Sequence, residues 1–199
     1  MAESVHDAAP RQVILFSGHL MDRPGRTPPR FSPALEPAAA REIGLALDRI
    51  GAGPQDLALC QAAAGGDLLF LEACQARSVP VQVMLPFDEA RFLCESVAPS
   101  AQGDQWLRRY QTVRTRLAEA PQILPADPNA GATVDDPFER CNAWLLSTAL
   151  RWGAARVRFI CLWNGSQSGR AGGTAHMIKQ ALQRGVAPQI IDTRRLEGA

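Results

Sequence analysis

Short apolar runs alternate along the chain with longer stretches of helical periodicity, and this alternation restricts the fold more than any other feature. The runs predict five strands, at residues 13–16, 57–60, 81–85, 157–163 and 189–191. Short strands that are apolar on both faces are typical of parallel sheets covered by helices. Strands that alternate with helices predict βαβ units. The sequence therefore predicts an α/β fold, a Rossmann-like open parallel sheet of about five strands with helices on both faces.

The segments between these strands contain the predicted helices and two long loops. Helices are predicted at residues 37–50, 67–77, 104–118, 137–152 and 174–185. Asp67 follows Gly65-Gly66 and is a candidate N-cap for the second helix. The proline-rich stretches 21–37 and 121–137 are predicted loops. Loops longer than about 12–15 residues in a compact domain are usually functional or disordered.

Composition indicates one globular domain over residues 11–195, preceded by a disordered leader at 1–10. The chain has 199 residues, 46% of them apolar, and a formal net charge of +1. Such a charge gives no overall field that attracts nucleic acid or an anionic membrane. No apolar run approaches the roughly 20 residues of a membrane span. The first ten residues do not form a signal peptide. We therefore expect a cytoplasmic protein with no membrane and no nucleic-acid partner.

Cysteine and histidine usage argues against a metal site. The five cysteines include no CxxC pair and lie mostly in apolar stretches, so they are predicted to be buried hydrophobic residues. The three histidines are scattered, and we predict no metal site. Neither GxGxxG nor GxxxxGK[ST] occurs, which removes the usual signatures of dinucleotide and ATP binding. No cofactor is predicted.

Three glycine-containing turns follow predicted strands. They are Ser17-Gly18-His19, Ala64-Gly65-Gly66-Asp67, and Trp163-Asn164-Gly165 with the subsequent Gly172-Gly173-Thr174. Ligands of open parallel sheets bind at the carboxyl ends of the strands. Glycine at such a turn lets the backbone come close to a ligand, and the free N–H groups at the start of the following helix favour binding of an anion. The turns together predict a phosphate site, although each turn alone is equally consistent with glycine needed for chain geometry.

These turns resemble those of the SLOG superfamily, which covers the lysine-decarboxylase-like LOG proteins and the DprA-like Rossmannoid domains. The resemblance rests on Phe16-Ser17-Gly18-His19, on Gly65-Gly66-Asp67 with Glu72, and on Gly172-Gly173-Thr174, and extends from about Val13 to Ile191. The stretch 163–175 is also similar to the DG…GTA stretch of nucleoside 2-deoxyribosyltransferases. A closer likeness is to a bacterial branch in which SGH…D-x-PGR recurs, sometimes beside cyclase or tetratricopeptide modules. The resemblance implies binding of nucleotides or their derivatives, and homo-oligomers.

Site residues follow from the turns and from the resemblance. Phosphate is expected on the N–H groups of Gly65, Gly66, Gly172, Gly173 and Thr174, with Ser17, Gly18, His19 and Arg26 beside it. Base or ribose is expected at Asp67, Glu72, Trp163, Asn164 and Gly165. The arginines of the first proline-rich loop, Arg23, Arg26 and Arg30, form either a phosphate clamp or a solvated loop. His176 either contacts phosphate or faces water.

One position departs from the resembled enzymes. Three residues after the GT threonine, where those enzymes use a glutamate on the N-glycosidic bond, this chain has Met177. A thioether cannot act as a base or nucleophile there. Glu72, or else Asp67, is the candidate substitute carboxylate. Three functions stay open: a sensor-type domain that binds a nucleotide-derived signal, a nucleoside or nucleotide N-glycosidase or transferase that uses Glu72 or Asp67, and a degenerate fold that acts as a protein-interaction module.

Overall fold

The computed structural model describes residues 9–125, 136–166 and 173–196. Within them six strands form one sheet in the order β4-β3-β2-β1-β5-β6, and every neighbouring pair is parallel. The strands are β1 (Val13–Gly18), β2 (Leu57–Cys60), β3 (Val81–Leu85), β4 (Gln122–Ile123), β5 (Val157–Trp163) and β6 (Pro188–Asp192). The predicted α/β fold with an open parallel sheet is confirmed, with six described strands where about five were expected.

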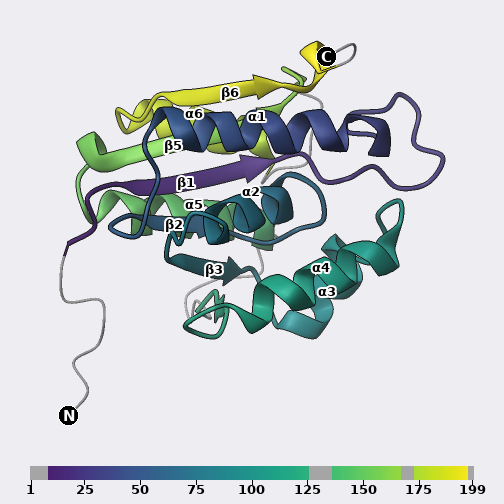
Figure 1. The fold of residues 1–199 in the computed structure, drawn as a ribbon, viewed down its shortest axis with the longest axis horizontal. Helices are drawn as coiled ribbons and strands as arrows, with labels where there is room; N and C mark the ends of the chain where they lie inside the picture. The colour runs from purple at the N-terminus through teal and green to yellow at the C-terminus, as the bar shows by residue number, and fades with distance from the viewer. Residues whose placement is uncertain (1–8, 126–135, 167–172, 197–199) are drawn as a thin grey trace.

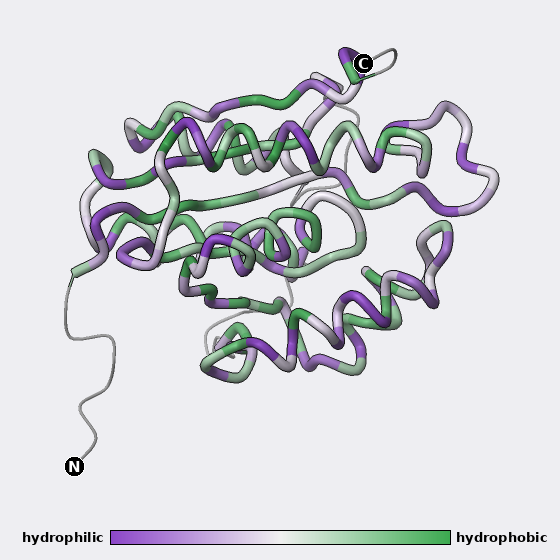
Figure 2. Tube along the Cα trace, viewed as in Figure 1, coloured by the Kyte–Doolittle hydropathy of each residue, from purple (hydrophilic) through white to green (hydrophobic). Residues whose placement is uncertain are grey.

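Helices cover both faces of the sheet (Figure 1). They are α1 (Glu36–Arg49), α2 (Gly66–Gln75), α3 (Glu89–Ser96), α4 (Gly103–Thr115), α5 (Pro137–Leu150) and α6 (Thr174–Gln183). Alternate residues of a strand point to opposite faces. Ile14 and Phe16 of β1 accordingly pack with α1, α2 and α4, while Val13 and Leu15 pack with α5 and α6. Figure 2 shows the matching pattern, in which apolar strands lie between helices of mixed hydropathy.

The sequence prediction missed one strand and one α-helix of the described residues. Strand β4 lies in the stretch 121–137 that was predicted to be a loop, and it has only two residues, too few to show a periodicity. Helix α3 has eight residues, and its N-cap is Asp88, whose carboxylate accepts the Arg91 N–H. Asp67 is not the N-cap of α2, because Gly65 has that position. Cys94 on α3 is exposed, unlike the other four cysteines, so the expectation of burial is wrong for it.

The connection from β4 to β5 reverses the direction in which strands are added. The sheet grows from β1 through β2 and β3 to β4 at one edge, and the chain then returns through α5 to place β5 on the other side of β1. Such a reversal leaves a crevice at the carboxyl ends of the two strands, where open α/β sheets bind ligands. The ends of β1 and β5 are therefore the first place to look for a site.

None of the helices in the described ranges has the length and apolar character of a membrane span.

Gly65 offers a test of how closely the chain is packed at this edge. Its φ of +104° is unfavourable for residues with a side chain, and a Cβ there would lie 2.5 Å from the Met21 amide nitrogen. Gly153 also has a positive φ, +89°, but a Cβ there meets nothing within 4 Å. We expect Gly65→Ala to lower the free energy of unfolding by about 3–5 kcal/mol, and Gly153→Ala by only about 1–2 kcal/mol. Denaturant unfolding measures both, and equal losses would contradict the packing described here.

Candidate functional site

The chain that leaves β1 crosses the carboxyl edge of the sheet and joins the two neighbouring turns. The His19 N–H donates to the Leu162 carbonyl at the end of β5 over 2.9 Å. On the other side, the Gly66 N–H donates to the His19 carbonyl over 3.1 Å, and Leu20 forms an antiparallel bridge with Gly65. The three turns singled out from the sequence thus meet at one edge, next to the crevice between β1 and β5.

The glycines of the first two turns serve close packing. A Cβ on Gly18 would lie 2.8 Å from the Phe16 ring and 3.2 Å from the Gly66 Cα. Gly65 packs against the backbone of Met21 and His19. The expectation that the Gly66 N–H holds a phosphate needs correction, because this N–H already donates to His19.

Asp67 is a buried carboxylate that stabilises the loop between β2 and α2. Its Oδ2 accepts the N–H groups of Ala63 at 3.2 Å and Ala62 at 3.4 Å. Burial raises the pKa of Asp67 to about 6, although these hydrogen bonds act in the opposite direction. These bonds hold the carboxylate against its own loop, and the Gly18 N–H at the end of β1 also acts on it, so the contact of Asp67 with a base or ribose stays a prediction.

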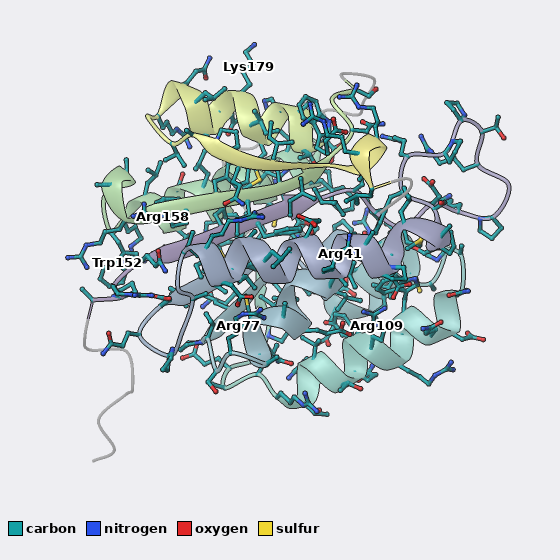
Figure 3. The ribbon with its side chains drawn as sticks, turned by 45° about the horizontal axis from the view of Figure 1, so that its top comes forward. Arg41, Arg77, Arg109, Trp152, Arg158 and Lys179 are labelled. Atoms are coloured by element: carbon teal, nitrogen blue, oxygen red, sulfur yellow. The ribbon has the colours of Figure 1, made fainter. Side chains whose placement is uncertain are left out.

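Glu72 is held in an ion pair between helices. The Arg109 side chain of α4 donates to Glu72 of α2 with Nε–Oε1 at 2.7 Å, and it also pairs with Glu36 of α1. The same guanidinium lies 4.2 Å from the centroid of the Trp106 ring. Figure 3 labels Arg109. Arg109 thus ties three helices together. The structure corrects the prediction of a free catalytic or ligand-binding Glu72, because its carboxylate is paired with Arg109.

His19 links the end of β1 to the end of β5. Its Nε2 accepts the backbone N–H of Asn164 at 3.0 Å, and the ring is almost completely buried. An imidazole that accepts at Nε2 carries its proton at Nδ1 when neutral. Burial lowers the pKa of His19 from its usual 6.5, and the charges of Arg30 and Arg26 act in the same direction. The hydrogen bond with Asn164 and the charge of Asp22 act against them. At neutral pH His19 is therefore an uncharged group that can donate one hydrogen bond.

Helix α6 begins beside this histidine. The Ser17 hydroxyl at the end of β1 donates to the Thr174 hydroxyl over 3.3 Å. Gly173 is the N-cap, with extended backbone and no side-chain capping bond, and the first N–H groups to bond to it are those of His176 and Met177. The N–H groups of Thr174 and Ala175 come earlier, so the helix itself offers them no acceptor. Gly172 lies outside the described residues.

The turn after β5 is closed by its own side chains. The Trp163 indole N–H donates to the Ser166 carbonyl at 3.1 Å, and the Asn164 Oδ1 accepts the Ser166 N–H at 3.0 Å. Gly165 has a φ of +77° and lies against the Arg194 guanidinium. The half-buried Trp163 ring also packs against the core under α5 and α6. Contact of these residues with a base therefore stays a prediction.

Polar pairs that the sequence prediction missed lie on the α5 side. The Gln61 amide, directly after β2, donates to Asn142 of α5 at 2.8 Å, and His176 of α6 contacts Glu139 of α5 at 3.1 Å. Asn142 interrupts the buried side of α5, which is the one signal that could have identified it. Within the described ranges, no three His, Cys, Asp or Glu side chains are grouped closely enough to hold a metal ion.

A shallow hollow on the described surface lies at the opposite edge of the sheet. Its lining includes Ile50, Arg158, Val186 and Gln189, near the amino ends of β5 and β6. The Arg158 guanidinium there donates to the carbonyls of Ala155 and Val157 (Figure 3). The lining of the hollow contains none of the ligand-binding or catalytic residues that were predicted from the sequence. We place the candidate site at the carboxyl edge, where helix N–H groups and polar side chains gather.

Comparison with known proteins does not assign the chain to a family. No family model and no curated protein matches the sequence. Among solved structures, the chain is similar to the molybdenum cofactor carrier protein MCP of Chlamydomonas reinhardtii, with 11% sequence identity over 92% of each chain and a TM-score of 0.32. At this distance the likeness carries no argument about the site.

The raised pKa of Asp67 predicts an unusual pH dependence of stability. Because the pKa is about 6 in the folded chain and 3.8 ordinarily, the folded state binds more protons between these values. The contribution of Asp67 to the free energy of unfolding therefore grows as the pH falls from 7 through 6. We expect Asp67→Asn to remove a gain of about 1 kcal/mol between pH 7 and pH 5.

Denaturant unfolding of both proteins at the two pH values measures this difference. The other titrating groups, His19 included, contribute equally to both proteins and cancel in the comparison. An identical pH dependence in the wild type and in Asp67→Asn would show that the carboxylate titrates as an ordinary exposed group.

Proposed function

We propose that this chain binds a nucleotide, or a small molecule derived from one, at the carboxyl edge of its sheet between the ends of β1 and β5. The observation that carries the proposal is the meeting of Ser17, His19 and the start of α6 where the strand order reverses. An anion is favoured at the start of a helix by the free N–H groups and by the helix dipole. Ligands of open α/β sheets bind at this topological position.

The donors at this edge suit a phosphate group. The N–H groups of Thr174 and Ala175 are hydrogen-bond donors of the type that binds phosphate oxygens, and the Ser17 hydroxyl, which donates to the Thr174 hydroxyl, leaves the Thr174 proton available for the phosphate. The neutral His19 ring adds the donor at Nδ1. Gly172 and Gly173 remain proposed contacts of the phosphate through their backbone, and Trp163 and Asn164 remain proposed contacts of the base or ribose.

The carboxylates favour binding over cleavage of an N-glycosidic bond. A glycosidase or transferase of this kind needs a free carboxylate beside the ligand. Glu72 is held by Arg109, and Asp67 is turned toward its own loop. Met177, at the position of the expected glutamate, packs in the core under α6. These contacts support binding over cleavage, because both carboxylates are already used within the protein.

A thermal-shift screen tests the proposal with nucleoside mono- and diphosphates, cyclic mono- and dinucleotides, and ADP-ribose. A ligand at about 100 times its Kd stabilises the fold by ~2.7 kcal/mol, which raises the Tm by several degrees. We expect Thr174→Val to weaken binding of the ligand about tenfold, because it removes a hydroxyl that donates to the phosphate, and Ser17→Ala to weaken it by up to about tenfold, because it removes the hydroxyl that orients Thr174. Thr115→Val, an exposed change on α4, is the matched control and is expected to leave Kd unchanged.

Two results would overturn this function. A folded wild-type protein that no compound in the screen stabilises would contradict nucleotide binding and favour the interaction module. Release of free base from a nucleoside monophosphate, lost in Glu72→Gln, would establish the N-glycosidase instead.

A further inference from the structure

We propose that the loop of residues 22–31 forms a second anion subsite, in which Arg26 and Arg30 bind a further phosphate of the ligand. The inference rests on the proposed function and deepens it, because it assigns the ligand to compounds with a diphosphate group. The subsite differs from the start of α6 in that it is built from guanidinium groups, which bind phosphate oxygens in pairs.

The loop is anchored at both ends. The Asp22 N–H donates to the Phe31 carbonyl over 2.9 Å, and the Asp22 Oδ2 accepts the N–H groups of Arg30 at 2.8 Å and Phe31 at 2.9 Å. The Phe31 side chain is completely buried in the core. The Thr193 hydroxyl, just after β6, donates to the Arg30 carbonyl over 3.1 Å. The backbone that presents the arginines is therefore held in place before any ligand arrives.

Positive charge on this loop exceeds the negative charge that neutralises it. The Arg26 Nε lies 3.3 Å from the Asp22 Oδ1, whereas no described carboxylate lies within ion-pair distance of the half-buried Arg30 guanidinium. Burial lowers the pKa of Arg30 and the nearby charge of Arg26 acts in the same direction, whereas the Asp22 carboxylate, which also pairs with Arg26, acts against them. A partly desolvated guanidinium beside a like charge is unfavourable unless an anion compensates it. Phosphate supplies that anion.

The pair of arginines lies close to the proposed site. Thr193, whose hydroxyl bonds to the Arg30 carbonyl, directly follows Asp192, which pairs with Trp163 at the end of β5, so the loop lies at the same edge of the sheet as His19. His19 in turn is bonded to Asn164 of the β5 turn. A ligand whose first phosphate lies at the start of α6 therefore has guanidinium groups near it for a second. This arrangement favours nucleoside diphosphates, or derivatives joined through a diphosphate, over monophosphates.

Calorimetric titration of the full chain tests the subsite with inorganic pyrophosphate, and with ADP, GDP, CDP and UDP, each beside its monophosphate. We expect Arg30→Gln and Arg26→Gln to raise the Kd of pyrophosphate at least tenfold and to remove the preference for diphosphates. Arg23→Gln, an exposed change on the same loop, is the control and is expected to change Kd less than twofold. Arg30→Lys keeps the charge without the paired donors, and an intermediate Kd is expected. Thermal melts confirm that each variant is folded.

The outcomes separate this inference from the function on which it rests. If nucleotides bind the wild type but Arg30→Gln leaves every affinity unchanged, the subsite is wrong and the proposed function stands. If Arg23→Gln weakens binding as much as Arg30→Gln does, the loop acts only through its net charge, and the subsite is again wrong. If neither pyrophosphate nor any nucleotide binds the folded wild type, both proposals fall.

Discussion

The backbone of Gly18 lies directly against that of Gly66, and the arrangement of the carboxyl edge depends on this contact. A Cβ on either glycine would lie 3.2 Å from the Cα of the other. Without side chains here, the end of β1 and the start of α2 come close enough for His19 and Leu20 to pair with the Gly65-Gly66 turn. The same path brings the His19 ring to Asn164 and leads the chain into the loop anchored by Asp22.

The edge separates polar groups that hold the fold together from those left for a ligand. The carboxylates of Asp67 and Glu72 are used within the protein, the first by the N–H groups of Ala62 and Ala63 and the second by Arg109. At the start of α6 the helix itself offers no acceptor to the N–H groups of Thr174 and Ala175, and on the loop of residues 22–31 the guanidinium groups of Arg26 and Arg30 outnumber the one carboxylate of Asp22. These donors and the excess positive charge support the proposed phosphate-bearing ligand.

The sequence predicted the sheet and the meeting of its turns because both follow from local patterns. Short apolar strands that alternate with helices form parallel sheets, and the carboxyl ends of parallel strands share one edge. It could not predict the roles of individual side chains at that edge. The role of Glu72 depends on its ion pair with Arg109, which is 37 residues away in the sequence. The loop of residues 22–31 is held partly by the hydrogen bond from Thr193 to Arg30, which is 163 residues away. Strand β4 was missed because two residues show no periodicity.

Backbone amide NMR with an equimolar mixture of ADP, GDP, CDP and UDP tests most directly whether this edge is the binding site. The account predicts that the largest chemical-shift changes occur at Ser17, His19, Arg30, Asn164 and Thr174. Residues around the hollow at the opposite edge, such as Arg158 and Gln189, are predicted to shift little. Changes concentrated at that opposite edge, or no changes at saturating nucleotide, would contradict the account.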